Sequence, residues 1–243
     1  VSLRRECLRW RKDLVRLMVK IGFPAGLQQI GVSIGLVILS TIVNSFGKDV
    51  VAAFGAAGRI DQFSFLPALS FGIAVSSITG QNFGARNFER SREVLRWGAI
   101  LTGGISVIIT VVVYFTSGSL IKIFTIDPEV IRLGTAYLHI VSLSYIPYAL
   151  MFVYTGCIRG AGDTVMATIQ TLFAFVLVRS VLAALLSHTP LAEKGIWISI
   201  TVSSVVGLLL SLLYYNTGKW KSKIIIRESE EKNPETPSLV FTE

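Results

Sequence analysis

Long apolar runs alternate with short polar breaks along most of this chain. Between Ile21 and Asn216 the runs follow one another at about 21–46, 52–80, 96–116, 131–156, 164–187 and 195–216. A helix of about 20 apolar residues crosses a hydrocarbon core about 30 Å thick, and a buried strand is much shorter. The pattern therefore predicts an all-α membrane protein, in which residues 21–216 form a bundle of six transmembrane helices.

The two flanking segments have a different pattern. In residues 1–20, apolar positions recur at steps of three and four residues with arginines and lysines between them, which predicts a basic amphipathic helix on the cytoplasmic membrane surface. Residues 217–243 are rich in Lys, Glu, Ser and Pro, which predicts a polar cytoplasmic tail without a packed core. Because the chain starts at Val1 and no signal-peptide pattern precedes the first run, we interpret it as a piece of a longer protein.

The composition is typical of a membrane protein, and the positions of its basic residues predict how the chain is oriented in the membrane. Hydrophobic residues make up 52% of the chain and charged residues 16%, against about 25% charged in an average soluble domain. The net charge of +8 does not indicate nucleic acid as a partner, because the basic residues gather at helix ends. With the amino terminus inside, 17 of the 23 lysines and arginines face the cytoplasm and 4 face outward. We therefore expect a multi-pass protein of the plasma membrane with both termini cytoplasmic.

Two of the expected cytoplasmic breaks are short and glycine-rich. They read Gly80-Gln81-Asn82-Phe83-Gly84-Ala85-Arg86 and Arg159-Gly160-Ala161-Gly162-Asp163-Thr164. A glycine can close a helix in the left-handed conformation, and an aspartate such as Asp163 can cap the helix that follows. Neither break is typical of a phosphate-binding loop, since no strand precedes it and no Walker lysine follows.

These two motifs, together with Gly22-Phe23-Pro24 at the start of the first span, resemble the carboxy-terminal lobe of the multidrug and toxic compound extrusion (MATE) transporters. The resemblance covers about residues 20–216. A full member has twelve spans in two lobes, so the resemblance implies that this chain is the second lobe and that residues 1–20 are the inter-lobe helix. It implies a secondary active antiporter that exports amphipathic, cationic organic compounds in exchange for H⁺ or Na⁺.

The same resemblance implies which partners the chain has. They are the lipid bilayer, a small organic substrate, and either an amino-terminal lobe or a second copy of this chain. No cofactor other than the coupling ion is expected. Related exporters also suggest an alternative, a flippase for lipid-linked substrates, and a further alternative is a fragment or scaffold that transports nothing.

Away from the span ends, four residues that carry or can take up a charge near neutral pH fall within the predicted spans, where charge is costly and often functional. Asp61 is the one carboxylate among them, and the others are Arg59, His139 and Arg179. At about 1.5 Å per residue, all four lie roughly 12–15 Å from the outer helix ends. Arg59 and Asp61 point to different sides of one helix, so Asp61 needs Arg179 or His139 as its partner. We hypothesise that this cluster lines the outer part of a transport cavity and takes part in ion coupling or conformational locking; alternatively, Arg59 and Asp61 lie among the lipid headgroups.

The first span has no carboxylate at Gln28-Gln29-Ile30-Gly31-Val32-Ser33, where some MATE branches carry an acidic residue of a cation site. By resemblance, the missing carboxylate argues against a sodium site in this lobe and favours proton coupling. Gln28 and Gln29 are expected to form hydrogen bonds either with a substrate or with a neighbouring helix.

Proline and aromatic residues supply the remaining candidates. Pro67 and Pro147 are expected to kink their helices, which suits alternating access around a central site. Tyr145 and Tyr148, near the second kink, either stack on a flat cationic substrate or pack against neighbouring helices. Trp197 is expected at the membrane interface. We expect no enzyme and no metal centre, because no metal-binding spacing, catalytic dyad or intramembrane carboxylate pair is present.

Overall fold

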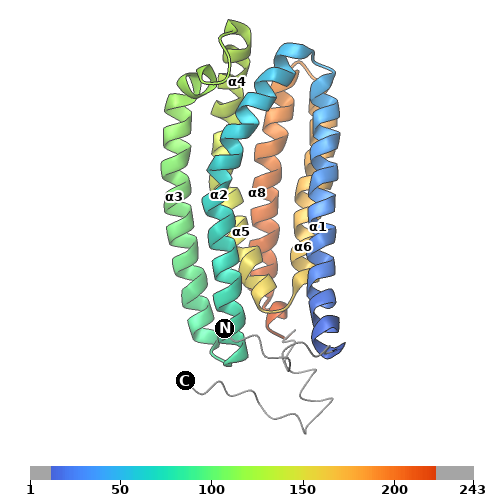
Figure 1. Cartoon of the computed structure of the whole chain (residues 1–243), viewed down its shortest axis with the longest axis vertical. Coiled ribbons are helices and arrows are strands. Elements are labelled where there is room, and N and C mark those ends of the chain that lie inside the picture. The colour runs from blue at the N-terminus through green and yellow to red at the C-terminus, as the bar shows by residue number, and fades with distance from the viewer. Residues whose placement is uncertain (1–11, 223–243) are drawn as a thin grey trace, which may run out of the picture.

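The computed structural model describes residues 12–222, and the expected bundle is present there. Six helices are long and apolar enough to cross a membrane: Gly22–Asn44, Lys48–Gly84, Phe88–Lys122, Pro128–Gly160, Thr164–Ser187 and Glu193–Thr217. They stand side by side as an upright bundle (Figure 1). The start of α1 and the end of α8 lie at one end, which we call the terminal end; the turn between α1 and α2 lies at the far end. The described part of the chain contains no strand.

The helices have these bounds: α1 Lys12–Asn44, α2 Lys48–Gly84, α3 Phe88–Lys122, α4 Pro128–Val141, α5 Tyr145–Gly160, α6 Thr164–Leu172, α7 Arg179–Ser187 and α8 Glu193–Thr217. Since α1 begins at Lys12 and is unbroken, residues 12–20 continue directly into the first span and are not set off from it. Most of the predicted amphipathic helix and the tail beyond residue 222 lie outside the described residues.

Two of the six spans contain an irregular segment. The fourth is divided into α4 and α5 by a 3₁₀ turn at Ser142–Ser144, just before Pro147. Pro147 lacks the N–H that the carbonyl of Leu143 would accept in a regular helix, which accounts for the break. The fifth is divided into α6 and α7 by a π-helical segment at Phe173–Val178, which the sequence analysis did not predict. By contrast α2 stays helical through Pro67, although Figure 1 shows that it leans in its upper part.

The two sides of α3 show which surface faces lipid. Its exposed side is made of large apolar residues, whereas small and hydroxyl-bearing residues face the bundle. The exposed set includes Trp97, Ile100, Leu101, Ile108, Val111, Val112 and Phe115. The buried set includes Ser91, Gly98, Thr102, Ser106, Thr110 and Ser117. Lipid tails accept the large side chains, and small residues let membrane helices approach closely.

Glycines bring α2 and α5 into backbone contact in the terminal half of the bundle. A Cβ atom at Gly156 would lie 2.4 Å from the carbonyl oxygen of Gly72, and one at Gly160 would lie 2.3 Å from that of Ser76. No larger residue fits at either position without moving the helices apart. Small residues four apart on α5 therefore fix this crossing, as is common between membrane helices.

The two glycine-rich turns differ in how they close. In the second, Gly162 adopts a left-handed conformation with φ of 102°, and the Asp163 side chain accepts a hydrogen bond from the backbone N–H of Met166 at 3.3 Å. Both features were predicted. In the first, the left-handed position is Arg86, with φ of 58°, rather than a glycine.

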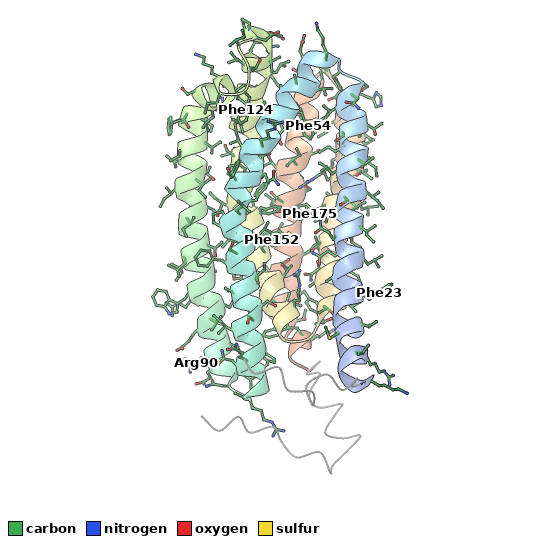
Figure 2. The ribbon with its side chains drawn as sticks, in the orientation of Figure 1. Phe23, Phe54, Arg90, Phe124, Phe152 and Phe175 are labelled. Carbon is green, nitrogen blue, oxygen red and sulfur yellow. The ribbon has the colours of Figure 1, made fainter. Side chains whose placement is uncertain are left out.

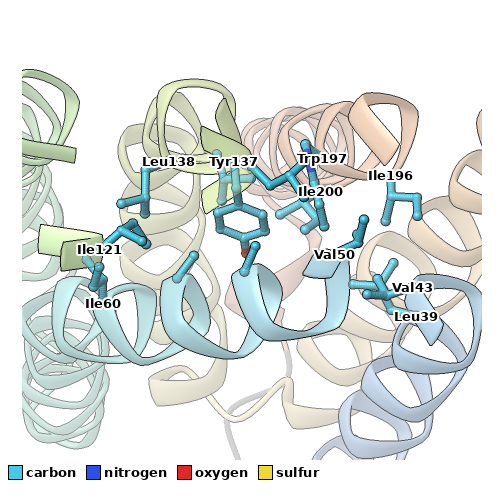
Figure 3. Close-up of a cluster of buried hydrophobic side chains, with 14 of the residues drawn as sticks. Leu39, Val43, Val50, Ile60, Ile121, Tyr137, Leu138, Ile196, Trp197 and Ile200 are labelled. Carbon is cyan, nitrogen blue, oxygen red and sulfur yellow. The ribbon is translucent and has the colours of Figure 1, made fainter. Parts of the chain in front are cut away.

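A hydrophobic core fills the far half of the bundle (Figure 3). It joins α1, α2, α3, α4 and α8 through Leu39, Val43, Val50, Ile60, Ile121, Tyr137, Leu138, Ile196, Trp197 and Ile200. Trp197 is fully buried in this core and stacks on Phe54, with ring centroids 5.8 Å apart. The prediction that Trp197 lies at the membrane interface is therefore wrong, because the indole packs inward against another ring.

Candidate functional site

The carboxylate of Asp61 is held inside the bundle by two tyrosine hydroxyls. The Tyr137 hydroxyl donates to Oδ2 at 2.6 Å, and the Tyr145 hydroxyl donates to Oδ1 at 2.5 Å. All three residues are buried, and Asp61 is 7% exposed. Figure 3 shows Tyr137 pointing from α4 towards α2, the helix that carries Asp61. A buried carboxylate thus links α2 to both halves of the interrupted fourth span.

Asp61 was expected to pair with Arg179 or His139, but its hydrogen-bond partners are two tyrosines. Within the described residues neither Arg179 nor His139 forms an ion pair with it, although Arg179 is near enough to interact electrostatically. Hydroxyls satisfy the carboxylate without bringing a second full charge out of water, which is the costly part of a buried ion pair. As predicted, Arg59 and Asp61 point to different sides of α2: Arg59 is exposed and Asp61 is buried.

His139 and Arg59 do not belong to this network. The His139 Nε2 atom lies 3.0 Å from the Ser117 hydroxyl and 3.1 Å from the carbonyl oxygen of Tyr114, so it joins α4 to α3. The Arg59 guanidinium lies over the Phe124 ring, 5.8 Å from its centroid. The predicted four-residue cluster therefore reduces to Asp61 and Arg179, because similar depth along the bundle does not place residues on facing sides.

Arg179 is the first residue of α7, directly after the π-helical segment. Its Nε donates to the Ser203 hydroxyl on α8 at 3.0 Å, and its guanidinium carbon lies 4.5 Å from the centroid of the Phe175 ring. Its charge also interacts with Tyr148 and Tyr137. π-helical turns inside helices occur frequently at functional sites. Here the turn precedes a cation directed towards the centre of the lobe.

An aromatic cluster continues from Arg179 across the bundle. The Tyr148 ring stacks on Phe65 at 4.1 Å and on Phe152 at 4.7 Å, and it lies 5.3 Å from Phe175. Phe65 also meets Tyr145 edge to face at 5.2 Å. Phe152 and Phe175 are labelled at mid-height of the bundle in Figure 2. Phe65, Tyr148 and Phe152 are each only partly buried, so this cluster presents ring surface from α2 and α5.

The two glutamines of the first span differ in their surroundings. The Gln28 side-chain oxygen accepts a hydrogen bond from the Arg159 guanidinium on α5 at 3.3 Å, which is the neighbouring-helix alternative. Gln29 is exposed. Gln28 therefore ties α1 to α5 at the terminal end, well away from Asp61.

Sequence reasoning missed five residues of this site: Tyr137, Phe65, Phe152, Phe175 and Ser203. Each is an ordinary residue type for a membrane helix, and its role depends on a contact with another helix. One signal was available for Tyr137, which lies eight residues before Tyr145. Their spacing of just over two helical turns puts both hydroxyls on a similar face.

The fold and this network together define a polytopic membrane protein in which a carboxylate and a guanidinium lie among aromatic residues at the centre of a helical bundle. The MatE family model matches residues 24–185, and the chain therefore belongs to the MatE family. It is 34% identical over 212 residues to the probable multidrug resistance protein YpnP of Bacillus subtilis. It is also 25% identical over 240 residues to the probable multidrug resistance protein NorM of Thermotoga maritima.

Solved structures share the fold. A MOP superfamily transporter from Pyrococcus furiosus superposes with a TM-score of 0.83 at 19% identity, over 89% of this chain and 49% of that one. An outward-facing multidrug resistance MATE family transporter gives a TM-score of 0.82, over 94% of this chain and 50% of that one. The alignments cover 87% of this chain and 47% of YpnP, and 96% of this chain and 52% of NorM. The chain thus spans about half the length of the curated relatives it matches, which agrees with a single lobe.

Proposed function

We propose that this chain is one lobe of a secondary active exporter of amphipathic organic compounds in the plasma membrane, and that Asp61 couples transport to protons. The observation that carries the proposal is the pair of hydroxyls that donate to Asp61 from α4 and α5. An ionised carboxylate accepts both bonds. A protonated one becomes a donor at one oxygen, so one tyrosine hydrogen loses its acceptor. Protonation thereby weakens the link between α2 and the fourth span.

The surroundings of Asp61 favour a proton over a sodium ion. Both of its oxygens already receive hydroxyl donors, and the positive charge of Arg179 lies nearby. A second cation would be repelled by the guanidinium in a medium of low dielectric constant. A proton needs no coordination shell and can be taken up by the carboxylate as it stands.

The exposed side of α2 supports a partner lobe. Among apolar residues such as Leu66 and Ile73, it carries polar residues at spacings of eight and seven in the middle of the helix. They are Gln62, Ser70 and Ser77. Polar side chains at membrane depth face a water-filled passage or another part of the protein rather than lipid. We propose that this side meets an amino-terminal lobe or a second copy of the chain, with the terminal end in the cytoplasm as the basic residues indicate.

The experiment is gradient-driven transport of a fluorescent organic dye in proteoliposomes. The chain is reconstituted alone and beside an amino-terminal lobe taken from a relative such as YpnP. We expect proton-driven dye movement that survives replacement of sodium by potassium and is lost in the Asp61→Asn variant. Transport that requires sodium, or that keeps its proton dependence in Asp61→Asn, would contradict the proposal.

A further inference from the structure

Arg179 and Tyr148 present hydrogen-bond donors that find no acceptor within residues 12–222. Of the Arg179 nitrogens, Nε donates to Ser203, while the two terminal nitrogens have no hydrogen bond or ion pair within the part of the chain that the structure describes. The Tyr148 hydroxyl likewise has no such partner there, in contrast to those of Tyr137 and Tyr145. None of these atoms is among the enclosed polar atoms that lack a partner, and both residues are only partly buried, so each atom keeps some accessible surface.

The two groups lie together, because the charge of Arg179 interacts with Tyr148 and both side chains contact the ring of Phe175. A guanidinium at membrane depth is costly unless it has an anionic or hydrated partner. Asp61 does not supply a direct one, since no ion pair joins it to Arg179 within the described residues. The site therefore offers an unneutralised fork of N–H donors and an adjacent hydroxyl donor.

We infer that Arg179, Tyr148 and Phe175 form a subsite for the carboxylate of an aromatic organic acid. The guanidinium fork matches the geometry of a carboxylate, and the Tyr148 hydroxyl adds a third donor. The flat part of such a ligand stacks on the exposed ring surface of Phe65, Tyr148 and Phe152. This subsite rests on the proposed function, because it gives the charge class of the exported compound.

This inference departs from the cationic substrate expected by resemblance. A cationic ring stacked on Tyr148 would lie beside Arg179 and be repelled by it, and the repulsion is stronger at low dielectric constant. Asp61, a carboxylate that could attract a cation in this region, is covered by two tyrosines. The accessible charge of the site is therefore positive.

The test is equilibrium binding of three naphthalene probes to the full chain in lipid nanodiscs. The amount of probe that binds to empty nanodiscs is subtracted. The probes are 1-naphthoate, 1-naphthylmethylammonium and the neutral 1-naphthylmethanol. We expect naphthoate to bind about tenfold more tightly than the ammonium probe. A charge-assisted hydrogen-bonded pair between the naphthoate carboxylate and the Arg179 guanidinium accounts for a difference of this size. In Arg179→Gln, naphthoate should lose about tenfold in affinity while the neutral probe is unchanged.

Two further variants keep the result interpretable if Arg179→Gln fails to fold. Tyr148→Phe keeps the ring and removes one donor, so naphthoate affinity should fall about threefold to tenfold and the neutral probe should be unaffected. Arg132→Gln is the matched control, because this exposed arginine pairs with Glu129 away from the subsite; it should bind all three probes as the unaltered chain does. The inference is overturned if naphthoate does not bind, if the ammonium probe binds more tightly, or if Arg132→Gln and Arg179→Gln have equal effects.

The binding measurement uses no ion gradient, so it separates the subsite from the transport cycle. Selective binding of naphthoate without dye transport would support the subsite and contradict the proposed exporter. Proton-driven transport without selective binding of naphthoate would support the proposed exporter and contradict the subsite.

Discussion

The hydroxyl of Tyr145 donates to Oδ1 of Asp61 at 2.5 Å, although the two residues are 84 positions apart. Tyr145 is the first residue of α5, directly after the 3₁₀ turn that interrupts the fourth span. The bond therefore joins α2 to the least regular point of that span. A change at the carboxylate is placed to alter how α5 sits against α2, and α5 carries most of the aromatic cluster.

Tyr145→Phe tests the strength of this link. The substitution leaves one oxygen of a buried carboxylate without a donor, so we expect a loss of about 1–3 kcal/mol in the free energy of unfolding. Thermal unfolding in detergent measures the effect. Tyr148→Phe is the control, since its hydroxyl makes no hydrogen bond within the described residues, and it should change stability by much less. Equal effects of the two variants would contradict the buried link.

His139→Gln tests whether the histidine belongs to the coupling machinery. Because its Nε2 atom contacts Ser117 and the backbone of Tyr114 rather than Asp61, the variant should keep the pH dependence of transport. Dye transport is measured as a function of external pH for both proteins. Loss of pH dependence in His139→Gln, with Asp61→Asn unaffected, would assign proton coupling to the histidine instead.

Gly156→Ala tests the close crossing of α2 and α5. The added Cβ would lie 2.4 Å from the carbonyl oxygen of Gly72, so the helices must separate. We expect a destabilisation of about 1–3 kcal/mol, as for other overpacked interiors. Gly104→Ala is the matched control on α3, where a Cβ meets nothing within 4 Å; it should be neutral or slightly stabilising. A tolerated Gly156→Ala would show that the crossing is looser than described.

Trp197→Ala tests the core of the far half. The indole is fully buried against Phe54 and Tyr137, so its removal should reduce the free energy of unfolding by about 3–5 kcal/mol. Trp97→Ala provides the comparison, because Trp97 is 60% exposed on the lipid side of α3. If truncation of Trp97 were the more damaging change, the burial of Trp197 would not be the feature that stabilises this region.

The sequence by itself determined the class of fold, the positions of the spans and the places of the two glycine-rich turns. Hydrophobic length is a local property, and in a membrane every helix must satisfy its own backbone hydrogen bonds, so each span can be recognised alone. The Asp163 cap was predictable for the same reason, since it acts within three residues of chain. Asp61 and Arg179 were also identified from sequence, because ionisable residues stand out against an apolar background.

Only the tertiary structure decided which side chains meet. Depth along the bundle follows from counting residues, but the direction in which each helix face points depends on how all the helices pack. That is why His139, at a similar depth, pairs with α3 whereas Tyr137, two residues earlier, reaches Asp61. The direction of Arg179 could not be predicted either, because the π-helical turn before it changes the register of the helix without any marker in the sequence.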